Sequence, residues 1–192
     1  MKFGSAVMLI VSLVFLPAPD AQARARSRQK NADPALTAQA YVIVDAKSGA
    51  ILHGKMPRKK LPPASTAKIM TVLIALQYLP MDYPAPVSRR AVNVAPSKAG
   101  LTLGAKYLIR DLVQACLVSS SNDAAVVIAE AVAGNEADFA KLMNQKALSL
   151  GMTDTRFINA TGLTEKNKKQ VTTAYDLTKM IREAMKDRRI DE

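Results

Sequence analysis

A serine and a lysine three residues apart, Ser65 and Lys68, form the first candidate for a reactive site, at the start of an apolar segment. Residues three apart on a helix share one face, so the serine oxygen can reach the lysine nitrogen. A serine needs a neighbour that takes its proton, and a lysine can do this only when burial or nearby positive charge lowers its pKa. The apolar residues after Lys68 offer such burial, and N–H groups at a helix N-terminus can stabilise an oxyanion. The pair therefore predicts a nucleophilic serine with a lysine as its base.

The same spacing occurs a second time, at Ser27 and Lys30, in a charged stretch with almost no apolar residues. Because no helix is expected there to hold the two side chains, we assign that copy no chemical role. Pro62-Pro63 before Ser65 and the apolar run after it place the other copy on a buried helix. On local pattern alone, Ser65 is equally compatible with a role as the N-cap of that helix.

A polar cluster that contains Ser120-Ser121-Asn122 stands between two apolar stretches that favour helices. The triplet has the pattern S-x-N, which accompanies S-x-x-K in penicillin-interacting serine enzymes. This second motif favours the reactive interpretation of Ser65 over the capping one.

The chain has one histidine, His53, and one cysteine, Cys116. His53 ends a short apolar run with no Asp or Glu within several residues, so we do not expect it to act as a catalytic base. Cys116 follows Leu112 and Val113 at helical spacing, which predicts a buried small side chain rather than a reactive thiol. A single cysteine also excludes a disulfide within the chain.

The elements that must position these residues follow from hydrophobic periodicity. Two short runs rich in β-branched residues, 41–45 and 50–53, flank the turn signal 46–49 and predict a hairpin. The helix that carries Lys68 is apolar on nearly every face, which is typical of a helix buried inside a domain. Helices are predicted over residues 65–79, 107–117, 124–133 and 135–150 and from Thr172 or Thr173 to Met185, with a long connection over 83–106.

Two of these helices carry start or stop signals. Asn122 or Asp123 is a candidate N-cap for the helix over 124–133. Asn135 and Asp138 have the spacing of a capping box at the start of the next helix, and Gly151 is expected to end it.

Composition describes one ordinary globular domain, with 49% hydrophobic residues, 22% charged residues and a formal net charge of +11. Lys2, the apolar run 6–16 and the triplet Ala21-Gln22-Ala23 predict a secretory signal peptide over residues 1–23 and hence an exported, periplasmic or extracytoplasmic protein. Residues 24–36 are predicted to be a flexible basic arm. Residues 37–192 then form the folded domain, without internal repeats.

The resemblance to a known family extends beyond the two motifs. Residues 41–76, 117–163 and 172–181, which include STAK, SSN and TTAYDL, resemble the D-alanyl-D-alanine carboxypeptidases, the low-molecular-mass penicillin-binding proteins. The resemblance implies an α+β fold of the serine β-lactamase or penicillin-binding-protein transpeptidase kind, with a helical lobe against an antiparallel sheet and the site between them. It implies no cofactor and no metal.

The same resemblance implies a role for each candidate residue. Ser65 would attack the carbonyl between two terminal D-alanines of a peptidoglycan stem peptide and become acylated, with Lys68 as proton acceptor. Ser120 would relay a proton to the departing amine, with Lys68 close by. The Asn122 amide would bind the substrate peptide and hold Lys68 in place. β-Lactam antibiotics would trap the same serine.

One expected element of the family pattern has no match in its usual place. The third motif, a K-T-G or K-S-G on a strand, is expected after the last helix, and the chain reaches Glu192 without it. Lys47-Ser48-Gly49 matches the letters but stands in the predicted hairpin turn, where turn chemistry explains it. We therefore expect a partial catalytic domain in which the C-terminal strands of the sheet are missing.

Two other functions stay open from the sequence. A class A-like β-lactamase would share the motif types but would need Asp where Ser121 stands and a glutamate that activates water, for which Glu165 and its neighbours are a poor match. A noncatalytic cell-wall-binding fragment is the other alternative. Export and the absence of a basic and aromatic stripe argue against a nucleic-acid partner. Peripheral membrane association, through an anchor such as relatives carry, stays open as well.

Overall fold

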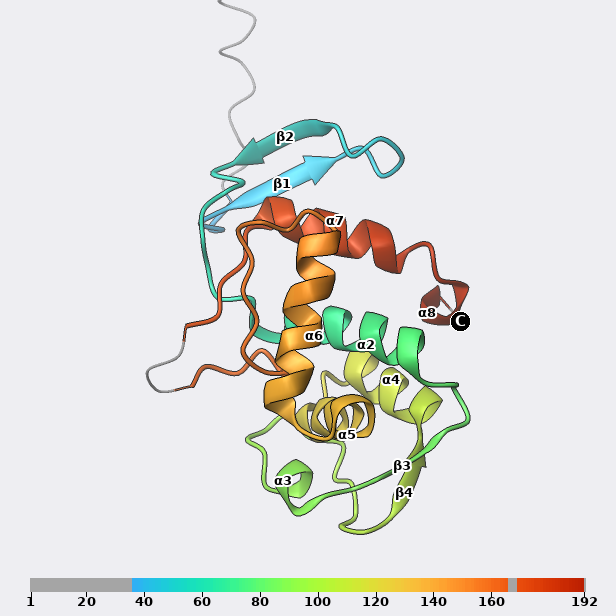
Figure 1. Ribbon diagram of the computed structural model, residues 1–192. Helices are drawn as coiled ribbons and strands as arrows, with labels where there is room; N and C mark the ends of the chain where they lie inside the picture. The colour runs from blue at the N-terminus through green and yellow to red at the C-terminus, as the bar shows by residue number, and fades with distance from the viewer. Residues whose placement is uncertain (1–35, 166–168, 192) are drawn as a thin grey trace, which may run out of the picture. The chain divides into compact units, whose positions relative to one another are not determined.

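The described secondary structure belongs to one of two compact units of the chain. The computed structural model describes residues 36–165 and 169–191 (Figure 1). The chain divides into the units Met1–Thr37 and Ala38–Glu192, and every element below belongs to the second. The predicted signal peptide, the second S-x-x-K copy and all but the last residue of the predicted arm lie outside the described residues.

In the part of the chain that the structure describes, the short strands all come before Ile109, and the elements after β4 are helices. In chain order they are β1 Tyr41–Val44, β2 Ile51–Lys55, the 3₁₀ turn η1 Ala64–Thr66, α2 Ala67–Tyr78, β3 Pro84–Pro86, α3 Arg89–Val92, β4 Lys106–Leu108, α4 Ile109–Val118, α5 Asn122–Ala133, α6 Glu136–Ser149, α7 Ala174–Ala184 and α8 Arg188–Asp191.

The predicted hairpin is present as the antiparallel pair of β1 and β2. Its turn is closed by Asp45, whose Oδ1 accepts hydrogen bonds from the Ser48 N–H and hydroxyl, each at 2.6 Å. Gly49 supplies the positive φ, 78°, that the turn requires. Lys47-Ser48-Gly49 is therefore a turn sequence, as predicted.

The second pair of strands, β3 and β4, was not predicted. Residues 83–106 were expected to be a connection and Tyr107 to begin a helix, but Tyr107 pairs with Ala85 in an antiparallel register. The N–H of Ile109 donates to the carbonyl of Tyr83 at 3.0 Å, so the residue before β3 provides an acceptor for the first turn of α4. This pairing is nonlocal and leaves no periodic signal in either segment, which explains the error.

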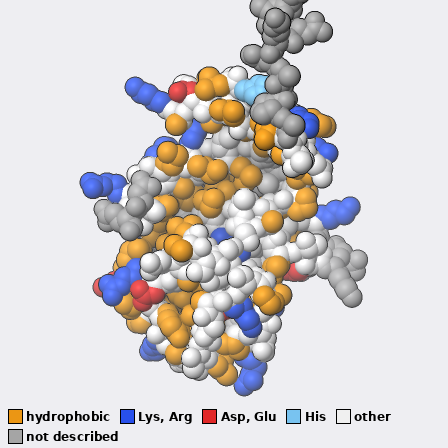
Figure 2. All heavy atoms as spheres, turned by 180° about the vertical axis from the view of Figure 1, so that it is seen from behind, with side chains coloured by type: hydrophobic (Ala, Val, Ile, Leu, Met, Phe, Trp, Pro, Cys, Tyr) orange, Lys and Arg blue, Asp and Glu red, His pale blue; other side chains and the backbone are white. Residues whose placement is uncertain are grey.

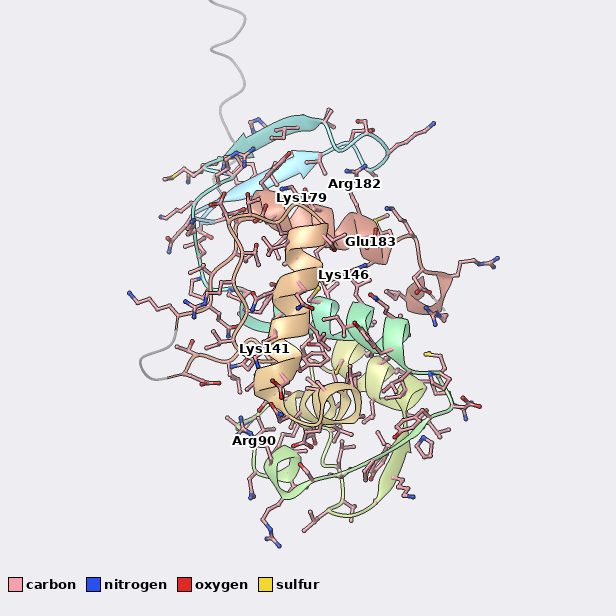
Figure 3. The ribbon with its side chains drawn as sticks, in the orientation of Figure 1. Arg90, Lys141, Lys146, Lys179, Arg182 and Glu183 are labelled. Carbon is pink, nitrogen blue, oxygen red and sulfur yellow. The ribbon has the colours of Figure 1, made fainter. Side chains whose placement is uncertain are left out.

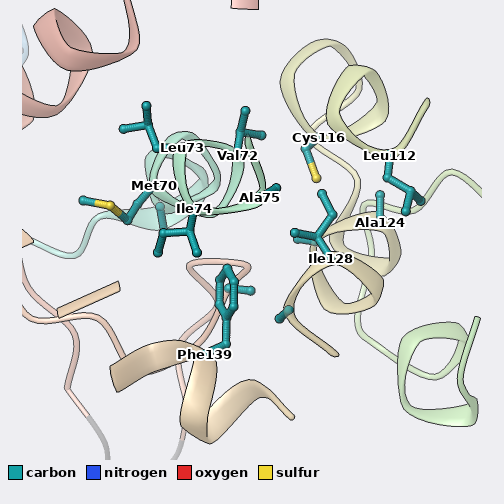
Figure 4. Packing of buried hydrophobic residues seen from close by; sticks show 14 of the residues in the cluster. Met70, Val72, Leu73, Ile74, Ala75, Leu112, Cys116, Ala124, Ile128 and Phe139 are labelled. Atoms are coloured by element: carbon teal, nitrogen blue, oxygen red, sulfur yellow. The ribbon is translucent and has the colours of Figure 1, made fainter. Parts of the chain in front are cut away.

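Helix α2 lies in the centre of the helical lobe, as its apolar faces predicted. It packs against α4, α5, α6 and α7, and its residues from Met70 to Leu76 are all buried. Figure 4 shows Ile74 facing Phe139 of α6 on one side of α2, and Cys116 and Ile128 on the side of α4 and α5. Ala67 and Lys68 in the first turn of α2 are buried as well, so the core surrounds the start of this helix.

The helix boundaries confirm some start signals and correct others. The Asn135 side chain accepts from the Asp138 N–H at 2.9 Å, so α6 begins at the predicted cap. Helix α5 begins at Asn122, two residues earlier than predicted, and its N-cap is Ser121 rather than Asn122 or Asp123. The earlier start is possible because the Asn122 N–H donates to the carbonyl of Ser97 at 2.8 Å, and an N–H that has this acceptor needs no capping side chain.

Helix α7 connects the hairpin to the helical lobe. It contacts β1 on one side and α2 on the other. Arg182 of α7 donates to the backbone carbonyls of Ala46 and Lys47 in the hairpin turn, and Glu183 forms an ion pair with Lys146 of α6 at 3.2 Å (Figure 3). The fold is therefore a helical lobe with small antiparallel sheets at its periphery. None of the helices in the described part of the chain combines the length and hydrophobicity that crossing a membrane requires.

Candidate active site

Ser65 and Lys68 lie next to each other at the start of α2. Ser65 is in the 3₁₀ turn η1 and is exposed, whereas Lys68 is in the first turn of α2 and only 2% exposed. Lys68 Nζ lies 3.2 Å from Ser65 Oγ and 3.0 Å from the carbonyl oxygen of Thr161. A neutral amine can donate to that carbonyl and still accept the hydroxyl proton of Ser65. The predicted geometry of the pair is present. Among the described residues the N-cap positions of η1 and α2 are Pro63 and Thr66 rather than Ser65.

The surroundings of Lys68 favour its uncharged form. Burial lowers the pKa of the Lys68 ammonium below its ordinary value of 10.5, and Cys116 acts in the opposite direction more weakly. Burial also raises the pKa of the Cys116 thiol to about 12, so this neighbour is neutral. Among the described residues, no carboxylate forms an ion pair with Lys68. The amine is therefore desolvated without a compensating negative charge.

The segment 159–163, which we call the strap, closes the site on the side of Lys68. The Asn159 Oδ1 accepts from the Thr161 hydroxyl at 3.1 Å and from the Gly162 N–H at 2.9 Å, and these bonds fold the strap into a tight turn. Gly162 has φ 82°, and a Cβ on it would lie 1.7 Å from the carbonyl oxygen of Ala64. Only glycine therefore lets the strap approach the residue before Ser65.

Thr71 fastens the strap to α2 one turn beyond Lys68. Its hydroxyl is fully buried and donates to the carbonyl of Ala160 at 2.7 Å. The carbonyls of two consecutive strap residues, Ala160 and Thr161, thus accept from two side chains of the same face of α2. The strap fixes the position of the Lys68 amine.

Ser120 stands at the sharp reversal between α4 and α5. Its φ is 53°, in the left-handed region, and the N–H of the following Ser121 donates back to the carbonyl of Ala115 at 3.1 Å. We expected Ser120 to lie close to Lys68. Among the described residues, however, the Ser120 hydroxyl forms no hydrogen bond with Lys68 or with any other group. Ser121 Oγ is buried without a hydrogen-bond partner in that part of the chain.

Asn122 is buried at the start of α5, with its amide directed to a neighbouring loop. Its Nδ2 donates to the carbonyl of Ala95 at 2.9 Å, and its own N–H donates to Ser97. The resemblance implied that this amide holds Lys68, but within the described ranges the two side chains share no hydrogen bond. The amide is instead oriented by the loop that precedes β4.

The remaining candidates lie in other bonding environments. The hydroxyl of Tyr41 lies 3.0 Å from His53 Nε2 on the exposed face of the hairpin. Cys116 is 2% exposed on α4, as predicted. Glu165, the glutamate weighed for a β-lactamase, accepts from the Asn159 amide at 3.1 Å.

The strap and Asp123 are the parts of the site that sequence reasoning missed. Thr161 lies 93 positions after Lys68, and no spacing rule connects residues so far apart. A usable signal was Thr71, because a hydroxyl inside the apolar run from Ile69 to Leu76 requires a buried hydrogen-bond partner. Asp123 was considered only as a cap, although its carboxylate binds the loop 99–101.

The class of site follows from the Ser65 hydroxyl, which lies beside the desolvated amine of Lys68 at the start of a buried helix. It is the arrangement of serine hydrolases that use lysine as the base for acyl transfer. The Peptidase S11 family model, D-alanyl-D-alanine carboxypeptidase, matches residues 27–192, and the chain belongs to this family. The resemblance inferred from the motifs is thereby confirmed.

Known relatives and structures agree with this assignment. The D-alanyl-D-alanine carboxypeptidase DacF of Bacillus subtilis is 32% identical over 191 residues, which cover 97% of this chain and 48% of the relative. The crystal structure of DacD from Francisella tularensis superposes with a TM-score of 0.76 at 36% identity, over 80% of this chain and 38% of that one.

Penicillin-binding protein D2 of Listeria monocytogenes, solved in its ampicillin-bound form, superposes with a TM-score of 0.71 at 30% identity, over 79% of this chain and 63% of that one. The predicted fold class, a helical lobe with antiparallel sheet of the penicillin-binding-protein kind, is confirmed. The chain spans about half the length of the Bacillus relative.

Proposed function

We propose that this chain carries the acylation machinery of a serine-type D-alanyl-D-alanine carboxypeptidase, with Ser65 as nucleophile. The observation that carries the proposal is the 3.2 Å approach of the buried Lys68 amine to the exposed Ser65 hydroxyl. Burial keeps the amine able to accept a proton, and exposure leaves the hydroxyl open to a peptide.

The reaction follows from the roles of the two groups. Lys68 Nζ takes the proton of Ser65 Oγ while the oxygen attacks the carbonyl between two terminal D-alanines. The peptide C–N bond breaks, the departing amine takes a proton relayed through Ser120, and D-alanine leaves. Water then hydrolyses the ester on Ser65, which returns the hydroxyl and releases the shortened stem peptide.

Two further residues have positioning roles in this proposal. The carbonyl of Thr161 accepts from Lys68 at 3.0 Å and keeps the amine aligned with the hydroxyl. The Asn122 amide supplies a polar contact for the substrate peptide, as the family pattern implies. A β-lactam ring, which mimics the scissile dipeptide, is expected to acylate the same serine.

The organisation of the whole chain is part of the proposal. Residues 1–23 act as a signal peptide, residues 24–36 as a basic arm, and residues 37–192 as part of a catalytic domain. The substrate is peptidoglycan stem peptide outside the cytoplasm. Family membership supports this substrate and location. The net charge of +11 favours carboxylate-bearing partners, and a stem peptide is one of them.

The test is release of D-alanine from a synthetic stem peptide that ends in D-Ala-D-Ala. The unaltered chain is expected to release one D-alanine per peptide, and Ser65→Ala to release none. Thr66→Ser is the matched control, because Thr66 is the next hydroxyl along the chain and donates to the carbonyl of Pro63. Binding of the peptide without release would instead indicate a noncatalytic binder, and rapid turnover of penicillin would indicate a β-lactamase.

A further inference from the structure

Asp123 is a buried carboxylate whose bonds mostly leave its own helix. It is 1% exposed, and its Oδ1 accepts from the N–H groups of Ala99 and Ala124, each at 2.9 Å. Its Oδ2 accepts from the N–H of Gly100 at 2.9 Å and of Leu101 at 3.1 Å. An N-cap needs one such bond within its helix, whereas three of these four connect Asp123 to a distant loop.

The loop 95–101 has few anchors apart from Asn122 and Asp123. Its residues from Ala95 to Gly100 are exposed, its apolar contact with the core is made by the partly buried Leu101, and the exposed Lys98 amine donates to the carbonyl of Val92 at 2.9 Å. Gly100 has φ 79°, and a Cβ added to it would meet no atom within 4 Å, so the tip of the loop is open. The described hydrogen bonds between this loop and α5 all end on two adjacent residues, Asn122 and Asp123.

Asp123 and Asn122 bind to different parts of the same loop. Asp123 fixes residues 99–101, and this fixes the preceding part of the same loop, which carries the carbonyls of Ala95 and Ser97. Those carbonyls accept from the side chain and the backbone N–H of Asn122. The orientation of the Asn122 amide therefore depends on a loop that Asp123 holds.

We infer that Asp123 is a positioning residue of the active site, which sets the orientation of the Asn122 amide through the loop 95–101. The inference rests on the proposed function, because it concerns how the acylation site is kept in order. Burying a carboxylate is costly unless its oxygens are bonded. Here the four N–H donors compensate that cost, and most of them order the loop rather than the helix.

The test is the rate of acylation by a fluorescent penicillin in Asp123→Asn, measured on the full chain and normalised to the folded fraction. Asparagine keeps the shape but replaces one oxygen by an NH₂ group, which leaves two of the four N–H donors without an acceptor. We expect the rate constant to fall about tenfold, since displacement of a positioning group weakens catalysis by this order or more. The amides of residues 99–101 are expected to exchange with deuterium faster.

Two controls separate positioning from stability. Asp138→Asn removes an exposed carboxylate from the first turn of α6 and should leave the acylation rate unchanged. Phe139→Leu weakens the core, where Phe139 is fully buried, and should lower the melting temperature without changing the rate per folded molecule. A single glycine inserted between Lys98 and Ala99 should reproduce the Asp123→Asn rate, because it shifts the donors while α5 stays intact.

The outcomes distinguish this inference from the proposed function. If the unaltered chain is acylated and both Asp123→Asn and the insertion match its rate per folded molecule, the inference is wrong and the proposed function stands. If the unaltered chain takes up no penicillin on Ser65, the proposed function itself is wrong. A reduced acylation rate in Asp123→Asn and in the insertion variant, with an unchanged rate per folded molecule in both controls, supports the positioning role.

Discussion

At the level of single residues, acylation of Ser65 depends on the protonation of Lys68. Because burial lowers its pKa below 10.5, the amine becomes a base at a lower pH than a lysine in water. Acylation of Ser65 is therefore expected to rise with pH and to level off below pH 10.5. Lys68→Arg should remove this rise and slow acylation by roughly 10²–10⁴-fold, since a guanidinium keeps its proton.

The control is Lys141→Arg, which changes an exposed lysine of α6 paired with Asp138 and should leave the pH profile unchanged.

The lowered pKa of Lys68 also makes the stability of the fold depend on pH. Between the folded pKa of Lys68 and 10.5, the unfolded chain binds more protons, so the free energy of unfolding rises with pH in that window. A pH-independent acylation rate would contradict the role of Lys68 as base.

Ser120 offers a second test, because two substitutions that both remove its hydroxyl differ in how easily their backbone adopts a positive φ. Ser120→Ala and Ser120→Gly both remove the hydroxyl, and both should slow D-alanine release equally if that hydroxyl relays the proton. Glycine adopts φ 53° without strain, so the glycine variant should be more stable than the alanine variant by about 1 kcal/mol. Urea unfolding measures the difference, and Ser119→Ala, at the neighbouring hydroxyl, is the control.

At the scale of elements, the close contact between the strap and the turn before α2 depends on Gly162. Gly162→Ala would place a Cβ 1.7 Å from the Ala64 carbonyl and also strain a φ of 82°. We expect a loss of about 2–5 kcal/mol in the free energy of unfolding, measured in urea. Gly134→Ala is matched in φ, 77°, but meets no atom within 4 Å, and should lose only about 1–2 kcal/mol. Equal losses would show that the contact does not matter.

The elements that could be predicted from the sequence are those with local signals. Interactions between near neighbours in sequence determine the cap at Asn135, the hairpin turn at Gly49 and the periodicity of apolar residues in α2. The pairing of Ala85 with Tyr107 and the bond from Lys68 to Thr161 join distant segments, and nothing in either segment alone encodes the partner. Spacing therefore predicted the reactive pair but not the strap that holds it.

At the scale of the whole molecule, one face carries apolar side chains in contact with solvent. Figure 2 shows hydrophobic side chains gathered on the side opposite to the view of Figure 1. Two neighbouring cavities, of about 580 and 180 Å³, share Leu117 and Ile190; the larger has both polar and apolar lining, and the smaller is lined by apolar side chains. Val118 of the larger cavity is 78% exposed, and Met185 of the smaller one is 59% exposed. Exposed apolar patches of this kind promote association.

Val118→Asp is therefore expected to reduce concentration-dependent light scattering without lowering the melting temperature. The control is Leu148→Asp, which changes a leucine of α6 that is 66% exposed and lies outside both cavities. The control should scatter as the unaltered chain does. Equal reductions in both variants would assign the effect to net charge rather than to this face.

The reactivity of Ser65 can be measured as the intact mass of the chain after exposure to benzylpenicillin. Because a buried amine beside the Ser65 hydroxyl makes that oxygen the nucleophile, we expect a gain of one penicilloyl group, located by peptide mapping on Ser65. Ser65→Ala should gain nothing. An unchanged mass in the unaltered chain, or the same gain in Ser65→Ala, would show that Ser65 is not the nucleophile.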